Sequence, residues 1–384
     1  MALTKVSTGV VDMSGNTGGL VIAKGDESER PASPSIGMIR ESTETTPGKV
    51  EVYTDNSGTP GWQFLEEAGT SITPPTVDYL VVAGGGGGGA SSSNYYSGGG
   101  GGAGGYRTSF GTGNINGGLT AVENTLSLST STGYTVTIGA GGAGGIQYSN
   151  QGSDGSNSVF SSITSIGGGG GGAGNGTSGG VSAGYGRTGG SGGGAGINKN
   201  ATRTGGSATT SPVSGFSGGS SQHPASYSGG GGGAGQIGET GSGNNSGDGG
   251  DGIQSSINVT STYYAGGGGG AIYDDTQPGS GGSGGQGGGG AGSNGGSSGS
   301  NGTDNKGGGG GGAQRSTSAP GSGTAARGGS GVVILRFPIS FAAPIISNIS
   351  PAGGLTINNA TDGTYRVMTY TCSTNTTVSA TLTF

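Results

Sequence analysis

Residues 79–90 read YLVVAGGGGGGA, a short apolar run that passes directly into six glycines closed by an alanine. The pattern recurs, and further glycine blocks that each end in alanine lie at 98–102, 167–172, 229–233, 266–270, 287–290 and 307–312. Glycine loses more backbone entropy on ordering than any other residue, so an isolated glycine run behaves as a flexible linker. A repeat of such runs, bracketed by β-type sequence, instead indicates that the runs order together.

The conformation that suits such runs is polyproline II, which has three residues per turn and rises about 3.1 Å per residue. Without side chains, several of these helices can lie side by side and satisfy their N–H and C=O groups on one another. The alanine that closes each block carries the first Cβ, so it either ends the close packing or covers its outside. The alternative is a disordered spacer.

The composition excludes one conventional hydrophobic core. The chain has 104 glycines in 384 residues, with 27% hydrophobic and 9% charged residues, against typical values of about 45–50% and about 25%. The net charge is −6 and the basic residues are scattered, so we expect no nucleic-acid partner. No apolar run approaches a membrane span of about 18 residues, and we expect neither membrane insertion nor a cleaved export signal.

Composition also divides the chain into three regions. Residues 1–77 are expected to form an N-terminal β module, with strands near 18–22, 37–40 and 49–53. Residues 78–338 form the glycine-rich domain, and residues 339–384, rich in Thr, Val and Ile, are expected to form a small C-terminal β domain.

Short strands are expected within the glycine-rich domain as well. The apolar runs 77–83 and 331–338 can pair and tie its ends together, and 126–128 with 134–138 reads as a hairpin. The expected fold class is therefore mainly β plus a bundle of glycine-rich polyproline II helices, with essentially no α-helix.

Nothing in the sequence favours catalysis. His223 is the only histidine and Cys372 the only cysteine, which leaves no catalytic triad, no disulfide within the chain and no Cys/His zinc site. Glycine motifs typical of nucleotide binding occur without the helix that must follow them. Asp248 and Asp251 are similar to a fragment of calcium-binding glycine repeats, but one fragment is weak evidence. We expect a protein that is not an enzyme and that holds no cofactor or metal.

Two regions of the chain, each represented by several short segments, carry a resemblance to a known family. The run 79–89, the step YTVTIGAGG at 134–142 and the closing GSGVVILR at 329–336 together resemble the glycine-rich domain of bacteriophage tail fibres and adhesins. The upstream segments 30–40, 50–53 and 61–65 are similar to a β module of phage fibre and virion proteins. Residues 339–384 match no receptor-binding tip of that family.

The resemblance implies an elongated appendage of the virion, on its tail or capsid, that is a homotrimer or another oligomer. Residues 1–77 would attach it to other tail or capsid proteins. Its target would be a host surface polysaccharide or outer-membrane protein. Alternatives are a capsid fibre, a decoration protein or a tail connector without receptor binding. A glycine-rich ice-binding protein is a further alternative, which would need a flat, regular Thr/Ala face.

Aromatic and polar residues between the glycine blocks are the candidate receptor contacts, because a tyrosine offers an apolar face with a polar tip. The candidates are Tyr95, Tyr96, Tyr148, Arg203, His223, Tyr227, Tyr263, Tyr264, Tyr273, Asp274 and Asp275. The competing interpretation is that these tyrosines cover the flanks of the packed glycine segments, which we call the glycine lattice, where few other side chains are available.

Overall fold

A computed structural model describes residues 23–35, 37–42, 49–56, 59–64, 76–91, 96–113, 115–146, 151–174, 183–197, 201–223, 227–272, 279–295, 298–314 and 324–384. The contacts within the chain divide it into two compact units, residues 1–70 and 71–384. Over the described residues nearly all regular structure is β-strand, and the helices η1 (Glu27–Glu29) and η2 (Gly117–Leu119) are single 3-10 turns. The prediction of a mainly β chain without α-helix is confirmed for these residues.

The first unit contains one four-stranded sheet in the order β1-β2-β3-β4. Its strands are β1 (Ala23–Gly25), β2 (Ile39–Ser42), β3 (Lys49–Asn56) and β4 (Thr59–Phe64). The expected strands at 37–40 and 49–53 correspond to β2 and β3, and the one at 18–22 lies outside the described residues. Glu51 is buried between the guanidinium groups of Arg30 at 2.8 Å and Arg40 at 3.2 Å, which neutralise its carboxylate.

The second unit begins and ends in two sheets that share a hydrophobic core. One sheet has the order β15-β16-β13-β5-β6, with β7 also paired to β5, and the other has the order β10-β9-β8-β17-β14. The first sheet consists of β5 (Thr76–Val82), β6 (Tyr106–Thr108), β7 (Leu126–Ser127), β13 (Val332–Pro338), β15 (Leu355–Asp362) and β16 (Tyr365–Cys372). The second consists of β8 (Gly133–Ile138), β9 (Ser158–Phe160), β10 (Ile163–Ser165), β14 (Ile345–Ser350) and β17 (Val378–Thr383).

The strands before and after the glycine segments pair as predicted. β5 and β13 are antiparallel, with Val82 opposite Val332 and Leu80 opposite Ile334. The hairpin expected at 126–138 is wrong, because β7 pairs with β5 whereas β8 pairs with β9 and β17. The alternation in β8 buries Val136 and Ile138 in the core between the sheets, and a partner beyond the local turn completes that burial.

The C-terminal residues belong to the same two sheets. β16 pairs with β13, and β17 pairs with β8. Met368 and Tyr370 from β16 and Leu382 from β17 are buried in one cluster with Tyr79, Phe160 and Phe337. Residues 339–384 therefore supply part of the core into which the glycine-rich region is anchored.

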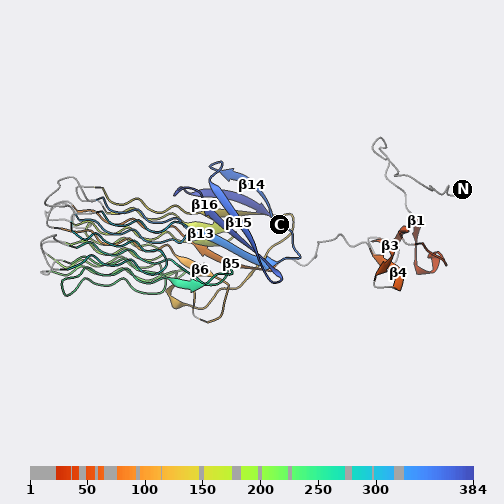
Figure 1. Cartoon of the computed structure of the whole chain (residues 1–384), viewed down its shortest axis with the longest axis horizontal. Helices are drawn as coiled ribbons and strands as arrows, with labels where there is room; N and C mark the ends of the chain where they lie inside the picture. The colour runs from red at the N-terminus through yellow and green to blue at the C-terminus, as the bar shows by residue number, and fades with distance from the viewer. Residues whose placement is uncertain are drawn as a thin grey trace. The chain divides into compact units, whose positions relative to one another are not determined.

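From the sheets, long extended segments run side by side (Figure 1). Segment 84–89 shows how they are held. Its N–H groups donate in turn to segments 153–156, 326–329 and 99–102, with the same partner segment returning every third residue. Its carbonyls accept from segments 142–145, 168–171 and 310–313. One glycine segment is thus hydrogen-bonded to six neighbours, whereas a strand in a sheet bonds to two.

Such close approach is possible only without side chains. A Cβ added at Gly84, Gly86 or Gly88 would lie under 3.0 Å from a backbone carbonyl oxygen of a neighbouring segment. Most of the alanines that close the blocks lie within this packing, since a Cβ at Gly104, directly after Ala103, would still lie under 3.0 Å from a backbone carbonyl oxygen. Ala90, Ala103, Ala173, Ala234, Ala271 and Ala313 are fully buried. Of the two roles expected for these alanines, the buried ones therefore do not cover the outside, while Ala291 is exposed.

At the edges of the lattice, side chains take the place of a missing neighbour. Asn245, Asp248 and Asp251 accept the backbone N–H groups of Ser280 at 3.0 Å, Ser283 at 2.6 Å and Gln286 at 2.7 Å. The same device recurs where Ser298, Asn301 and Asp304 accept from Thr324, Arg327 and Ser330. The three-residue spacing places each of these side chains on the same side of its segment. The Asp248–Asp251 pair, similar in sequence to a calcium-binding fragment, satisfies backbone donors here.

Candidate binding surfaces

The described candidate residues lie at two different ends of the glycine segments. The strands lie at one end of the glycine segments, the sheet end, and the segments run from there to an opposite end, the loop end (Figure 1). Tyr96 precedes the glycine segment that leads to β6, and Gln222, next to His223, forms a β-bridge with Tyr227. Segment 228–233 joins Tyr227 to Ala234, and Ala234 packs in a cluster with Leu80, Ile334 and Tyr264. Six extended residues span about 20 Å, so the two ends cannot contribute to one small site.

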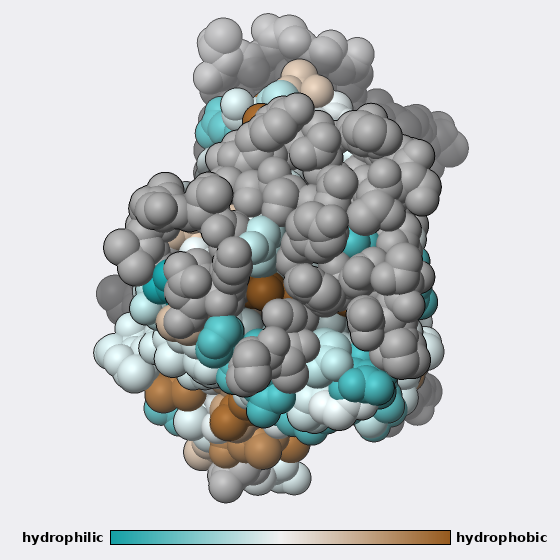
Figure 2. All heavy atoms as spheres, turned by 90° about the vertical axis from the view of Figure 1, so that its left-hand side faces the viewer, coloured by the Kyte–Doolittle hydropathy of each residue, from teal (hydrophilic) through white to brown (hydrophobic). Residues whose placement is uncertain are grey.

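At the loop end, Tyr227 is the best-defined aromatic candidate. Its hydroxyl donates to Oδ1 of Asn244 at 2.8 Å, and a Cβ at Gly241 would collide with Cβ of Tyr227. Tyr227 is therefore half-buried against a neighbouring glycine segment. Tyr96 is also half-buried and His223 is exposed. Among the described residues on this face, hydrophilic and near-neutral surface predominates and hydrophobic surface gathers at the lower edge (Figure 2).

The turn beside Tyr227 is rigidly built. Ser242 and Asn245 exchange both backbone hydrogen bonds at 2.9 Å, and the two residues between them, Gly243 and Asn244, have φ values of 57° and 80°. Positive φ at both central positions is typical of the type I′ turn, and Gly and Asn are the residues that adopt it most readily. The Gly-Asn pair is a turn signal in the sequence, although this turn is not among the features predicted from it.

Other candidates are placed where a large ligand has little access. Arg203 is 7% exposed, and its guanidinium lies 4.8 Å from the centre of the Tyr185 ring. Tyr264 is 4% exposed, burial raises its pKa to about 12, and its hydroxyl accepts from Asn258 Nδ2 at 3.0 Å. Tyr263 is 37% exposed but lies at the sheet end, in the hairpin of β11 (Ile253–Ser255) and β12 (Thr262–Tyr264). Tyr95, Tyr148, Tyr273, Asp274 and Asp275 lie outside the described residues.

A polar groove runs beside the 242–245 turn. It has a volume of about 230 Å³ and is lined by Glu239, Thr240, Ser242, Asn245, Ser246, Asp248, Ser280, Gly281 and Ser283. Its lining by described residues comes from three glycine segments and contains no aliphatic or aromatic side chain. Within the described part of the chain, no group of three or more His, Cys, Asp or Glu residues is arranged to hold a metal ion.

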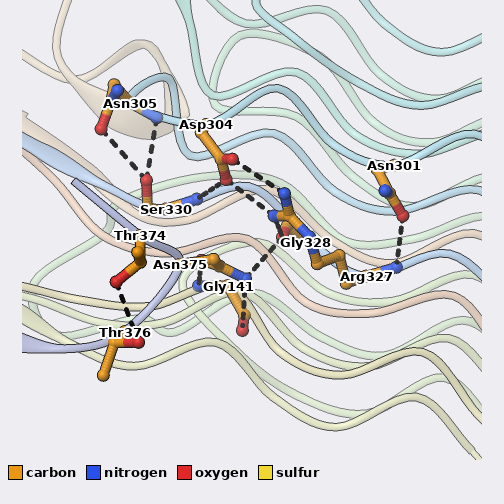
Figure 3. A network of polar contacts seen from close by, with 10 residues as sticks. All are labelled: Gly141, Asn301, Asp304, Asn305, Arg327, Gly328, Ser330, Thr374, Asn375 and Thr376. Carbon is orange, nitrogen blue, oxygen red and sulfur yellow. Dashed lines mark hydrogen bonds and ion pairs between the residues drawn. The ribbon is translucent and has the colours of Figure 1, made fainter. Parts of the chain in front are cut away.

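A second, open groove of about 550 Å³ lies next to the polar network drawn in Figure 3. Arg327 donates to both carboxylate oxygens of Asp304 at 2.7 and 2.8 Å, and these hydrogen bonds lower the pKa of Asp304. Asn375, from the loop between β16 and β17, accepts the N–H of Gly141 at 2.7 Å and donates to the carbonyls of Gly141 and Gly328. Asn375 therefore bonds as the backbone of a neighbouring segment would, and ties the C-terminal strands to the lattice.

The single cysteine and the single histidine, the residues considered above for catalysis, lie in different surroundings. Cys372 is 6% exposed in the core between the sheets, and His223 is exposed at the loop end. Among the described residues, no helix is long and apolar enough to cross a lipid bilayer.

Extended glycine segments that hydrogen-bond to one another and are anchored in a β sandwich define a glycine-rich β protein. The comparison with protein families agrees, since a family model described as a glycine-rich domain matches residues 66–338. The chain belongs to this glycine-rich domain family. A search among curated proteins finds no match.

Proposed function

We propose that the chain is a non-enzymatic phage virion protein, a tail fibre or adhesin that attaches the particle to a host surface receptor. The observation that carries this proposal is that the chain returns repeatedly to the same end of a unit whose segments are hydrogen-bonded side by side. Loops fixed on a rigid scaffold are common places for binding residues. In this arrangement the sheet end anchors the fold, while the loop end carries the connections between glycine segments.

The proposal includes the finer architecture. The three-residue period of the hydrogen bonds supports polyglycine II helices, the side-chain-free form of polyproline II. We propose that three copies form an elongated fibre, with residues 1–77 attached to other tail or capsid proteins. Light scattering on the purified chain tests the trimer, and a monomeric mass would contradict it.

The attachment function is tested by binding of fluorescently labelled protein to a panel of bacterial species. The test variant is the double substitution Tyr96→Ser and Tyr227→Ser at the loop end. The matched control is Tyr263→Ser, which removes an exposed tyrosine at the sheet end. We expect the loop-end variant to lose most cell binding while the control retains it.

The outcomes separate attachment from the alternatives. Binding that is lost equally in both variants, or in neither, would contradict recognition by this loop-end surface. If the wild-type chain binds no species that the phage infects, a capsid fibre, decoration protein or connector becomes the better assignment. The ice-binding alternative has less support, because the edge rows at 245, 248 and 251 carry Asn and Asp and are occupied with backbone N–H groups.

A further inference from the structure

The polar groove beside the 242–245 turn has the properties of a built binding site. Its buried floor includes Ser246, which is 4% exposed and donates to the carbonyl of Ala271 at 2.6 Å. Its wall is fixed by Asn245, which accepts both the N–H and the hydroxyl of Ser280 at 3.0 and 3.2 Å. The groove therefore has its shape before any ligand arrives.

Several polar groups that line this groove can form further hydrogen bonds with a ligand. One oxygen of Asp248 accepts the N–H of Ser283, and among the described residues no group is hydrogen-bonded to its other oxygen, which can accept from a ligand. Glu239 is exposed, and in the described part of the chain its carboxylate takes part in no hydrogen bond or ion pair. Its backbone is fixed, because its N–H donates to the backbone carbonyl of Asp248 and its own carbonyl accepts from the N–H of Gly230. The hydroxyls of Ser242 and Ser283 add groups that both donate and accept.

The lining selects one class of ligand. The described lining residues include two carboxylates and no Lys or Arg, and this negative charge disfavours phosphate, sulfate and acidic sugars. None of these described residues has an aliphatic or aromatic side chain, which disfavours an apolar ligand. A ligand rich in hydroxyl groups can donate to the carboxylates and exchange hydrogen bonds with the serines. At about 230 Å³ the groove is smaller than the pockets of roughly 300–1,000 Å³ that enclose drug-sized ligands, which suits one ring of a longer chain.

We propose that this groove binds a neutral sugar residue of a polysaccharide, with Glu239 and Asp248 accepting hydrogen bonds from its hydroxyl groups. The proposal rests on the attachment function and specifies the chemistry of the receptor. Single contacts of this kind are weak, but an oligomer that presents several copies binds a repeating polymer with much higher avidity.

The test measures binding of the full chain to immobilised polymers of glucose, galactose, mannose and N-acetylglucosamine, with polymers of glucuronic and sialic acid for comparison. The test variant combines Glu239→Gln with Ser283→Ala. The control combines Gln236→Ala with Gln286→Ala, which changes exposed residues three positions away on the same two segments but outside the groove. We expect at least one neutral polymer to bind, about tenfold more weakly in the test variant and unchanged in the control.

Four results would overturn the proposal: no neutral polymer binds, acidic polymers bind better, the test variant binds as well as wild type, or a calcium chelator abolishes binding. The last would assign the carboxylates to a cation. The same variants in the bacterial binding assay separate this proposal from the attachment function. If wild type and test variant bind cells equally well, the groove proposal fails while attachment stands.

Discussion

The substitution Gly86→Ala tests the claim that the fold depends on backbone contact between glycine segments. An added Cβ would lie under 3.0 Å from the carbonyl oxygens of both Gly168 and Gly169, so the backbone has to move. Overpacking of this kind costs about 1–3 kcal/mol. The movement also weakens the bonds from Gly86 N–H to Gly102 and from Gly310 N–H to Gly86, now 2.8 and 2.9 Å, each worth about 1 kcal/mol.

The expected loss for Gly86→Ala is therefore about 3–5 kcal/mol in the free energy of unfolding. The matched control is Gly184→Ala, where the nearest atom to the new Cβ is Cγ of Arg203 at 3.4 Å, an ordinary van der Waals contact. Alanine there restricts the unfolded chain, so the control is expected to be neutral or to gain up to about 1 kcal/mol. The measurement is denaturant unfolding followed by circular dichroism. Equal stability of the two variants would refute the role of close backbone contact.

Three further predictions follow from the same contacts. Asp251→Ala removes the acceptor of the Gln286 N–H and should cost about 1 kcal/mol in denaturant unfolding, whereas Asp251→Asn keeps an acceptor oxygen and should cost less; equal losses would argue against the edge bonds. The hydrogen bonds from Arg327 lower the pKa of Asp304, so this carboxylate stabilises the fold above about pH 4 and the effect disappears as the pH falls through the lowered value. The unfolding midpoints of wild type and Asp304→Asn should accordingly differ at pH 6 and converge toward pH 2, and a constant difference would contradict this sign. Truncation after Pro338 removes β16 and β17, which pair with β13 and β8; size-exclusion chromatography should show aggregated or unfolded protein, and a monodisperse, folded fragment would contradict the shared core.

The sequence predicts the parts of this fold that depend on composition and local pattern. The apolar runs that became β5 and β13 are long enough, and close enough to the glycine blocks, for their pairing to be expected. The pairing of β8 depends on β17, more than 200 residues away, and a local alternation cannot identify such a partner. The partner of β16 cannot be identified from local pattern either. Composition separates residues 339–384 from the glycine-rich domain, although apolar side chains of both regions lie in one core.

The candidate surfaces are predicted less well. Tyr263 and Tyr264 stand just before a glycine block, as Tyr96 and Tyr227 do, but the β11–β12 hairpin lies at the sheet end. The number of residues between blocks does not reveal at which end the chain turns. The edge rows had a usable signal in the three-residue spacing of Asn245, Asp248 and Asp251. In a glycine-rich stretch this spacing indicates side chains on one side of a segment whose hydrogen bonds repeat every third residue. It is therefore an alternative to the cation-binding interpretation.

Hydrogen–deuterium exchange on the intact chain tests the central claim most directly, namely that the glycine segments are ordered by hydrogen bonds to one another. Peptides covering 84–89, 98–102 and 307–312 should be protected to the same degree as those covering β5 and β13, since nearly all of their amides are bonded to neighbouring segments and open only with the whole unit. Exchange of the glycine peptides at the rate of an unstructured chain, beside protected β-strands, would contradict the account.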